Sequence, residues 1–304
     1  PITTLLLAQT NESKATRRWR IIKSLLWMLL LAGVIAMFWD NNAEKANAAL
    51  HAAPHTALIN IQGEIGSDTP ASADLLLPAL REAFEASGAQ AVMLRINSPG
   101  GSPVQAGQIN DEIRRLKAKH HKKVYVVVDE MCASAAYYIA ASADEIYVDK
   151  ASLVGSIGVL MDGFGFTGTM EKLGVERRLL TAGTDKGMLD PFSPQNPEQV
   201  AHAQAMLDEI HQQFIAVVKE GRGKRLPADA NVFTGKFWTG QNAIKLGLAD
   251  KVGSLDQVAR DVVKAEDIVD YTPSENMAER LAKKLGAGMG ESMSGALGLQ
   301  ARLR

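Results

Sequence analysis

Cysteine is almost absent from this chain, which has one, Cys132, among 304 residues. A single thiol excludes an intramolecular disulfide framework and a zinc site made of several cysteines. Neither sign of charge is in excess, because 33 Lys and Arg residues stand against 34 Asp and Glu residues, for a net charge of -1. The sequence therefore gives no electrostatic reason to expect a polyanionic partner such as nucleic acid.

Glycine spacings typical of phosphate sites are missing from the loop at residues 97–103, which reads NSPGGSP. The loop follows an apolar run and precedes a helical pattern, but it has neither Gly-x-Gly-x-x-Gly nor Gly-Lys-Ser/Thr spacing. Its adjacent Gly100 and Gly101 would let a substrate backbone approach closely, and free N–H groups at a helix start can stabilise an anion. An ordinary strand-to-helix turn is the alternative.

One long hydrophobic run stands near the N-terminus. Residues 21–39 are almost wholly apolar and are interrupted only by Lys23 and Ser24. A helix of about 19 residues would be about 28 Å long, close to the roughly 30 Å hydrocarbon core of a bilayer. The basic cluster RRWR at residues 17–20 precedes this run, so we expect the N-terminal tail in the cytoplasm and the rest outside.

A cleaved signal peptide and a buried core helix both fit this run less well than an anchor does. A signal peptide would have a shorter apolar core, although the small residues at 43–49 could mimic a processing site. A buried core helix would have a polar face, which this segment lacks. We therefore expect a cytoplasmic tail at 1–20, a transmembrane anchor at 21–39, a linker at 40–55, a folded domain at 56–265 and a C-terminal extension at 266–304.

Strand and helix patterns alternate after residue 55. Apolar or β-branched runs predict strands at 56–65, 91–96, 124–128 and 145–148, with further strands considered at 156–160 and 176–180. Helical periodicity predicts helices at 71–86, 104–120, 135–143, 197–220 and 237–246. This alternation is typical of a largely parallel α/β sheet. No second copy of the unit occurs, so any repetition must come from assembly of several chains.

A serine stands where such a fold places a crevice. Ser134, in the sequence MCASAAYYIA at 131–140, follows one apolar strand, and Gly100 and Gly101 follow the strand before it. The carboxyl ends of adjacent parallel strands meet at one edge of the sheet, the usual position of a ligand crevice. Ser134 is therefore a candidate nucleophile.

A serine hydroxyl needs a base to act as a nucleophile. Six histidines are available, but two lie in the linker, two in a basic turn at 120–123, and His202 and His211 on the long helix. None is placed by a motif, so a Ser-His-Asp triad has little support. Lys186 is another candidate, because burial can hold a lysine amine neutral. The residues around it are equally consistent with a surface loop.

Five segments occur in an order that identifies a family. They are RINSPGG at 95–101, ASAAYYIA at 133–140, VGSIGV at 154–159, AGTDKG at 182–187 and FTG at 233–235. Together they resemble the signal peptide peptidase A family, which includes SohB-like proteins. Members are membrane-bound serine proteases with a Ser/Lys dyad. The resemblance implies an α/β fold of the Clp protease/crotonase type, with a repeated ββα-type core preceded by one N-terminal transmembrane helix.

The same resemblance implies a role for each site residue. Ser134 would be the nucleophile, Lys186 the general base, and Ser156 the residue whose hydroxyl orients the lysine amine. The N–H groups of Gly101 and Ala135 would form the oxyanion hole. No cofactor and no metal are implied. One departure stands out, because many relatives have Gly-Gly after the nucleophile where this chain has Ala135 and Ala136.

The implied function is that of a membrane-anchored serine endopeptidase that degrades signal-peptide remnants or other apolar peptides. Its catalytic domain would lie on the outer side of the inner membrane, in a ring of several copies. The alternatives are a membrane-anchored scaffold of the same fold without catalysis and, less favoured, a crotonase-type acyl-CoA enzyme.

A topology reporter tests the expected orientation. An enzyme that works only outside the cytoplasm, fused after Tyr271, should be active, because the Lys/Arg excess precedes residues 21–39. The same reporter fused after residue 20 should be inactive. Activity of a cytoplasm-only reporter after Tyr271 would contradict the orientation.

Overall fold

The structure is a computed structural model that describes residues 19, 22–28, 30–31, 51–227 and 231–273. The chain divides into two compact units, residues 1–53 and 54–304. In the first unit, the described residues 22–28 and 30–31 are helical. The rest of the predicted anchor lies outside the described residues. Within the described part of the chain, no helix is long and apolar enough to cross a bilayer, so the anchor stays a prediction.

One eight-stranded mixed sheet forms the centre of the second unit, and its main order is β6-β5-β3-β2-β1-β8. Its strands are β1 (His55–Gln62), β2 (Ala89–Ser98), β3 (Lys123–Ala133), β4 (Glu145–Val148), β5 (Leu153–Gly155), β6 (Phe237–Thr239), β7 (Lys251–Val252) and β8 (Ile268–Asp270). All pairings are parallel except β5 with β6. The expectation of a largely parallel α/β sheet is confirmed. The sheet also extends past residue 265, since β8 pairs with β1.

β3 is the strand that divides the sheet. Its residues 125–128 pair with β4, and its residues 131–133 pair with β5. This second pairing explains why β3 runs to Ala133, past the expected end at residue 128. β5 and β4 therefore lie on the same side of β3 at different levels, and β5 reaches the carboxyl end of the sheet.

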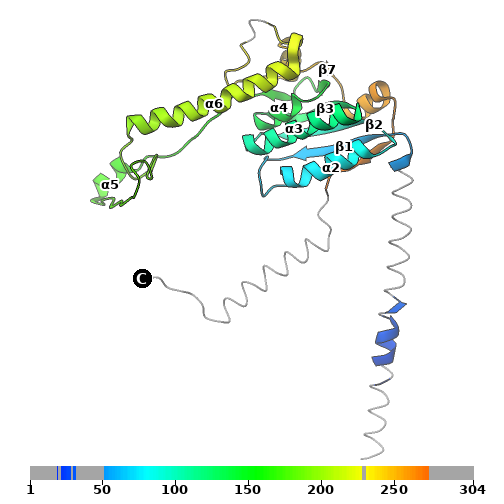
Figure 1. Ribbon diagram of the computed structural model, residues 1–304, viewed down its shortest axis with the longest axis horizontal. Helices are drawn as coiled ribbons and strands as arrows, with labels where there is room; N and C mark the ends of the chain where they lie inside the picture. Colours follow the sequence, from blue (N-terminus) through cyan, green and yellow to red (C-terminus); the bar gives the residue numbers. More distant parts are fainter. Residues whose placement is uncertain (1–18, 20–21, 29, 32–50, 228–230, 274–304) are drawn as a thin grey trace, which may run out of the picture. The chain divides into compact units, whose positions relative to one another are not determined.

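Helices cover both faces of the sheet. They are α2 (Ala73–Glu85), α3 (Pro103–His120), α4 (Ala135–Ala140), α5 (Thr167–Leu173), α6 (Pro197–Arg222), α7 (Gly240–Lys245) and α8 (Leu255–Gln257), with a π-helix at Val258–Val263. Figure 1 shows α2 and α3 lying across β1 and β2. The main core holds Ile59, Leu94 and Val126, and a smaller core on the other face holds Met93 and Val127. Because both faces are covered, the central strands are continuous apolar runs.

Three expected elements differ from the structure. Residues 156–160 and 176–180 are not strands, and residues 237–246 are not one helix but β6 followed by α7. Phe237, Trp238 and Thr239 are β-formers, and they pair with β5 at the edge of the sheet. Tertiary pairing therefore overrides the helical pattern in this segment.

The long helix α6 is fastened to the sheet at its C-terminal end by a buried ion pair. Arg222 is 1% exposed, and its Nη1 and Nη2 each donate to the Asp250 carboxylate over 2.9 Å. Its Nε donates to the Gly247 carbonyl over 2.7 Å, and Asp250 also accepts the Ile146 N–H of β4 over 2.7 Å. The guanidinium and the carboxylate are therefore both satisfied by direct protein contacts.

Close packing supports the same junction. A Cβ on Gly221 of α6 would lie 1.9 Å from the Ala141 carbonyl oxygen, so only glycine permits this approach. Burial opposes ionisation of Asp250, but the hydrogen bonds and the charge of Arg222 outweigh it and lower the pKa of that carboxyl. Asp250 therefore stabilises the fold above its ordinary pKa of 3.8 and loses this contribution as the pH falls below that value.

Removing the arginine tests this junction. Arg222→Met should lower the free energy of unfolding by about 3–5 kcal/mol, because it leaves a buried carboxylate unpaired. Arg260→Met, which breaks the exposed pair with Asp261, should cost less than about 1 kcal/mol. Urea unfolding at pH 7 measures both. Equal losses of unfolding free energy in the two variants would show that the buried Arg222 pair stabilises the fold no more than an exposed pair does.

Candidate active site

Ser134 occupies a tight turn between β3 and α4. Its φ is 53° and its ψ is -124°, a region that L-residues rarely adopt. Its N–H donates to the Gly155 carbonyl over 2.8 Å, and its carbonyl accepts the Tyr138 N–H over 3.0 Å. These bonds hold a strained strand-to-helix turn that places the half-buried Ser134 side chain at the carboxyl end of the sheet.

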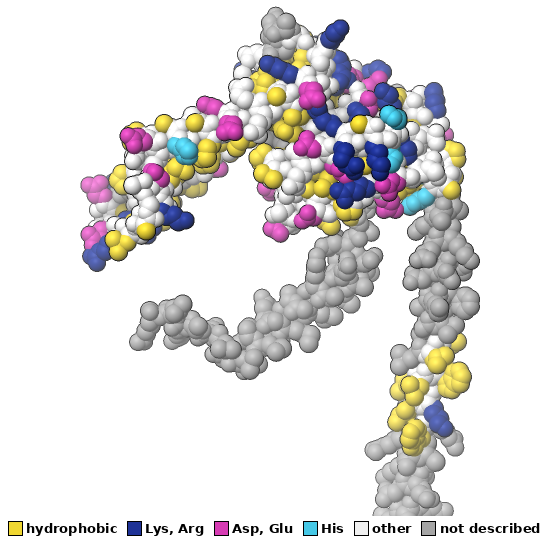
Figure 2. Space-filling model, viewed as in Figure 1, with side chains coloured by type: hydrophobic (Ala, Val, Ile, Leu, Met, Phe, Trp, Pro, Cys, Tyr) yellow, Lys and Arg dark blue, Asp and Glu magenta, His cyan; other side chains and the backbone are white. Residues whose placement is uncertain are grey.

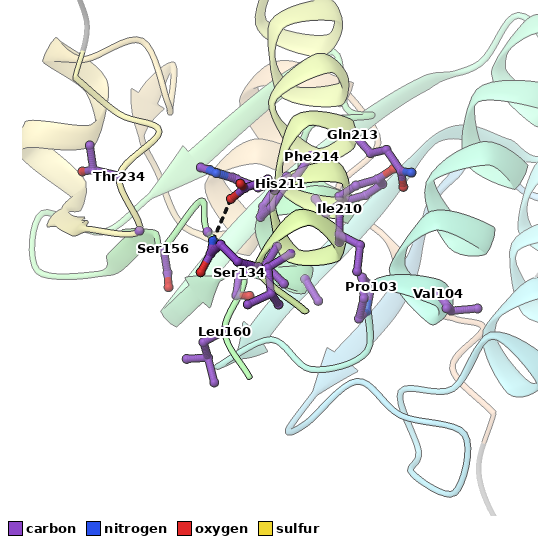
Figure 3. A pocket seen from close by; sticks show the side chains of 18 residues that line it. Pro103, Val104, Ser134, Ser156, Leu160, Ile210, His211, Gln213, Phe214 and Thr234 are labelled. Atoms are coloured by element: carbon purple, nitrogen blue, oxygen red, sulfur yellow. Dashed lines mark hydrogen bonds between the residues drawn. The ribbon is translucent and has the colours of Figure 1, made fainter. Parts of the chain in front are cut away.

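Ser156 occupies the matching position after the neighbouring strand. Ala133 and Gly155 are register partners, so Ser134 and Ser156 follow β3 and β5 at the same level. Ser156 also has a φ of 53°, and its N–H donates to the Lys236 carbonyl over 2.7 Å. Both serines line one cavity of about 550 Å³ (Figure 3). The structure therefore brings the predicted nucleophile and the predicted orienting residue together.

The glycine loop passes directly against the Ser134 turn. Gly100 has a φ of 106°, and a Cβ there would lie 2.7 Å from Ser134 Cβ and 3.0 Å from the Ala135 nitrogen. Gly101 has a φ of 142°, and a Cβ there would lie 2.1 Å from the Ile65 carbonyl oxygen. Only glycine fits at these two positions.

Two backbone donors near Ser134 have no acceptor in the part of the chain that the structure describes. Ile65 donates to the Gly100 carbonyl and accepts from Ser102, which leaves the Gly101 N–H between them unused. Ala135 is the first residue of α4, where a helical N–H has no partner within its own helix. Within the described ranges, neither N–H donates to a protein group. Both are therefore available to an oxyanion.

The alanine that replaces the usual glycine fits this geometry. Ala135 and Ala136 are not among the described residues with positive φ, because they already belong to α4. Alanine is favoured over glycine in a helix. The Ala135 N–H can therefore be presented without the freedom of a glycine.

The cavity is mainly apolar, and α6 forms one of its walls. Its apolar side chains include Val104, Leu160, Leu207, Ile210 and Phe214. Figure 3 shows α6 passing over the cavity, with Ser134 and Ser156 on one side and Pro103 and Val104 on the other. Such a concave apolar site with a few polar groups is typical of a ligand site.

His211 is a site residue that the sequence did not identify. It lies on α6, is half-buried, and lines the cavity together with Ser134. Its Nε2 lies 3.2 Å from the Ile157 carbonyl oxygen, which can only accept, so Nε2 carries the proton of that bond. Its spacing from Leu207 and Phe214 puts it on the apolar face of α6. That periodicity was the feature of the sequence that could have identified His211 as a cavity residue.

Lys186, the predicted base, does not line this cavity. Its side chain is exposed, and neighbouring Asp185 accepts a hydrogen bond from Gln199 Nε2, near the start of α6, over 3.0 Å. Residues 199 and 211 are about 18 Å apart along a helix that rises about 1.5 Å per residue. Figure 1 shows α5 and the start of α6 extending away from the sheet. Within one chain, Lys186 is therefore not brought to Ser134.

Cys132 has no access to the cavity. The side chain is fully buried, and burial raises the pKa of its thiol, which keeps it protonated. Among the residues that the structure describes, no three His, Cys, Asp or Glu side chains are grouped as a metal site would require. The polar groups that line the cavity include the Ser134 and Ser156 hydroxyls, Asp208 and His211.

Known proteins match much of the chain. The model of Peptidase family S49 matches residues 116–269. A protein of Methanocaldococcus jannaschii that is named as a protease is 35% identical over 67% of this chain and 68% of its own length. A protein of Enterococcus faecium named as signal peptide peptidase SppA is 29% identical over 66% of this chain and 58% of its own.

Two further similarities are partial. A protein of Brucella melitensis named as the Na(+)/H(+) antiporter NhaA is 48% identical over 58% of this chain, but this chain covers 24% of that protein. Its transport activity is therefore not carried over. A solved ClpP1 mutant from Listeria monocytogenes has a TM-score of 0.42 and 13% identity, over 69% of this chain and 95% of its own. That likeness is too distant to support a statement about fold or function.

A methyl group on Gly100 tests the contact with Ser134. Gly100→Ala should lower the labelling rate of Ser134 by a serine-directed fluorophosphonate at least about tenfold, because the turn must move away. Gly107→Ala is the matched control, since a Cβ there meets nothing within 4 Å. Circular dichroism checks the fold of both. Wild-type labelling of Gly100→Ala would contradict the contact.

Proposed function

The chain belongs to peptidase family S49, and we propose that it is a membrane-anchored serine endopeptidase that cleaves signal-peptide remnants or other apolar peptides. One observation carries the proposal. Ser134 is held in a strained turn at an apolar cavity, beside the unused N–H groups of Gly101 and Ala135. This arrangement supplies the nucleophile and the oxyanion donors for attack on a peptide carbonyl, to which a base must be added.

The reaction follows from these groups. Ser134 Oγ attacks the scissile carbonyl carbon while a base takes its proton, and the carbonyl oxygen becomes an oxyanion that accepts from Gly101 and Ala135. The base then gives the proton to the leaving amine, and water hydrolyses the acyl-enzyme by the same steps. Losing one oxyanion donor typically raises the barrier by about 2.7–4 kcal/mol.

Lys186 acts as the base in this proposal, and it reaches Ser134 from a neighbouring copy of the chain. Its exposure in the described chain supports supply in trans. The segment before Lys186, at residues 160–180, exposes several large apolar side chains, which would be unusual on a monomer. They include Leu160 at 79%, Phe164 at 78%, Leu173 at 73% and Leu180 at 96% exposed. Burying them between copies would also seclude the amine, as a neutral lysine requires, with the Ser156 hydroxyl to orient it.

His211 of the same chain is the alternative base. It lines the cavity with Ser134, and its Nδ1 is free to accept because Nε2–H is used by Ile157. The two assignments differ in one respect that can be measured, because only the lysine comes from another copy.

The apolar cavity supports an apolar peptide as substrate. The anchor at 21–39, the inner-membrane location with the catalytic domain outside the cytoplasm, the ring of copies and the Clp protease/crotonase relationship belong to the proposal. The competing functions are a non-catalytic scaffold and an acyl-CoA enzyme. Labelling of Ser134 by a fluorophosphonate together with peptide hydrolysis distinguishes the proposal from both.

Mixing two inactive variants tests the dyad. Ser134→Ala and Lys186→Ala should each lose at least about a thousandfold in kcat. When they are dissociated, mixed equally and reassembled, about a quarter of the sites should hold both residues, so activity should return towards about a quarter of wild type. Peptide hydrolysis measures this recovery.

Other outcomes have distinct meanings. If Lys186→Ala stays active and His211→Gln is inactive, the base is His211. If neither variant regains activity in the mixture, Lys186 does not act from a neighbouring copy. If the wild-type chain hydrolyses no peptide and Ser134 is not labelled, the scaffold function is favoured.

A further inference from the structure

The cavity beside Ser134 has one carboxylate on its wall. Among the described residues that line it, Asp208 is the only Asp or Glu, and none is Lys or Arg. The remaining wall is apolar, small or uncharged. A single fixed charge in such a wall can discriminate between ligands that an apolar slot alone would accept equally.

The Asp208 carboxylate is oriented but not neutralised. Gln204, one turn earlier on α6, donates its Nε2–H to Asp208 Oδ1 over 2.8 Å. Asp208 makes no ion pair with any described residue, and His211, three residues on, bonds Ile157 instead. The side chain is exposed and lines the cavity, so the carboxylate is open to a ligand there.

The surroundings of Asp208 suit a long cationic side chain. Leu207 and Ile210 line the same wall, so the methylene stem of a lysine or arginine can pack on them while its head reaches the carboxylate. Gln204 and Leu207 also line an adjoining cavity of about 330 Å³. The two cavities therefore continue along α6, with Asp208 near the place where they adjoin. Figure 2 shows acidic side chains on the exposed face of the molecule along this helix.

We propose that Asp208 is a specificity-determining residue that selects apolar peptides carrying a lysine or arginine near the scissile bond. The inference rests on the proposed peptidase function and adds the charge of the substrate to it. An exposed ion pair of this kind gives about a two- to fivefold preference.

Matched peptides test the preference. The test compares short fluorogenic apolar peptides that differ at one position. Lys, Gln or Glu is placed at each position around the cleaved bond in turn. At one position, kcat/KM of the full chain should be about two- to fivefold higher with Lys than with Glu. Asp208→Asn should remove this ratio, and Asp208→Lys should reverse it. Glu209→Gln, a change at an exposed carboxylate outside the cavity wall, should keep it.

A binding readout separates this inference from the proposed function. The Ser134→Ala chain binds the same peptides without cleaving them, and its Kd should show the same ratio. If wild type cleaves nothing but Kd depends on Asp208, the peptidase proposal fails and the Asp208 inference stands. If peptides are cleaved and the Lys/Glu ratio is the same in Asp208→Asn, the inference is overturned. A kcat loss equal for all three peptides would also overturn it, because Asp208 would then act on the catalytic groups.

Discussion

The buried pair between Arg222 and Asp250 is the interaction on which the cavity depends. It joins the last turn of α6 to the turn before β7 and, through the Ile146 N–H, to β4. The wall of the cavity, including Leu207 and His211, belongs to the same helix. The pair fixes the C-terminal end of α6, while Phe214 and Val218 of the same helix pack in the main core beneath it. A contact far from the reacting atoms thus sets the shape of the site.

Backbone strain is the second constraint, and both serines of the cavity carry it. Of the five described non-glycine residues with positive φ, two are Ser134 and Ser156. Such conformations typically cost about 1–3 kcal/mol each and persist only where surrounding contacts fix them. Here the fixing contacts are backbone bonds from neighbouring strands, Ser134 to Gly155 and Ser156 to Lys236. The sheet therefore holds both hydroxyls in place before any substrate arrives.

The central sheet was predictable, and its edge was not. β1, β2 and β3 are continuous apolar runs, and α3 has a Ser102 cap and a proline at its start, so local signals identify them. The sequence at 237–246 has helical periodicity, yet its first three residues form β6 because β5 offers them an edge. Such pairing depends on a strand more than eighty positions away, which no local pattern contains.

Sequence alone determined the kind of fold, the family and the small set of residues around Ser134. The order of five motifs identifies those positions, and a glycine pair after a strand already restricts the loop beside it. Tertiary structure decided which residues meet. It placed His211 and Asp208 in the cavity, because α6 packs Phe214 and Val218 into the core and is held at its end by Arg222. It left Lys186 outside, because the segment that carries Lys186 contacts the start of α6, while the cavity lies further along that helix.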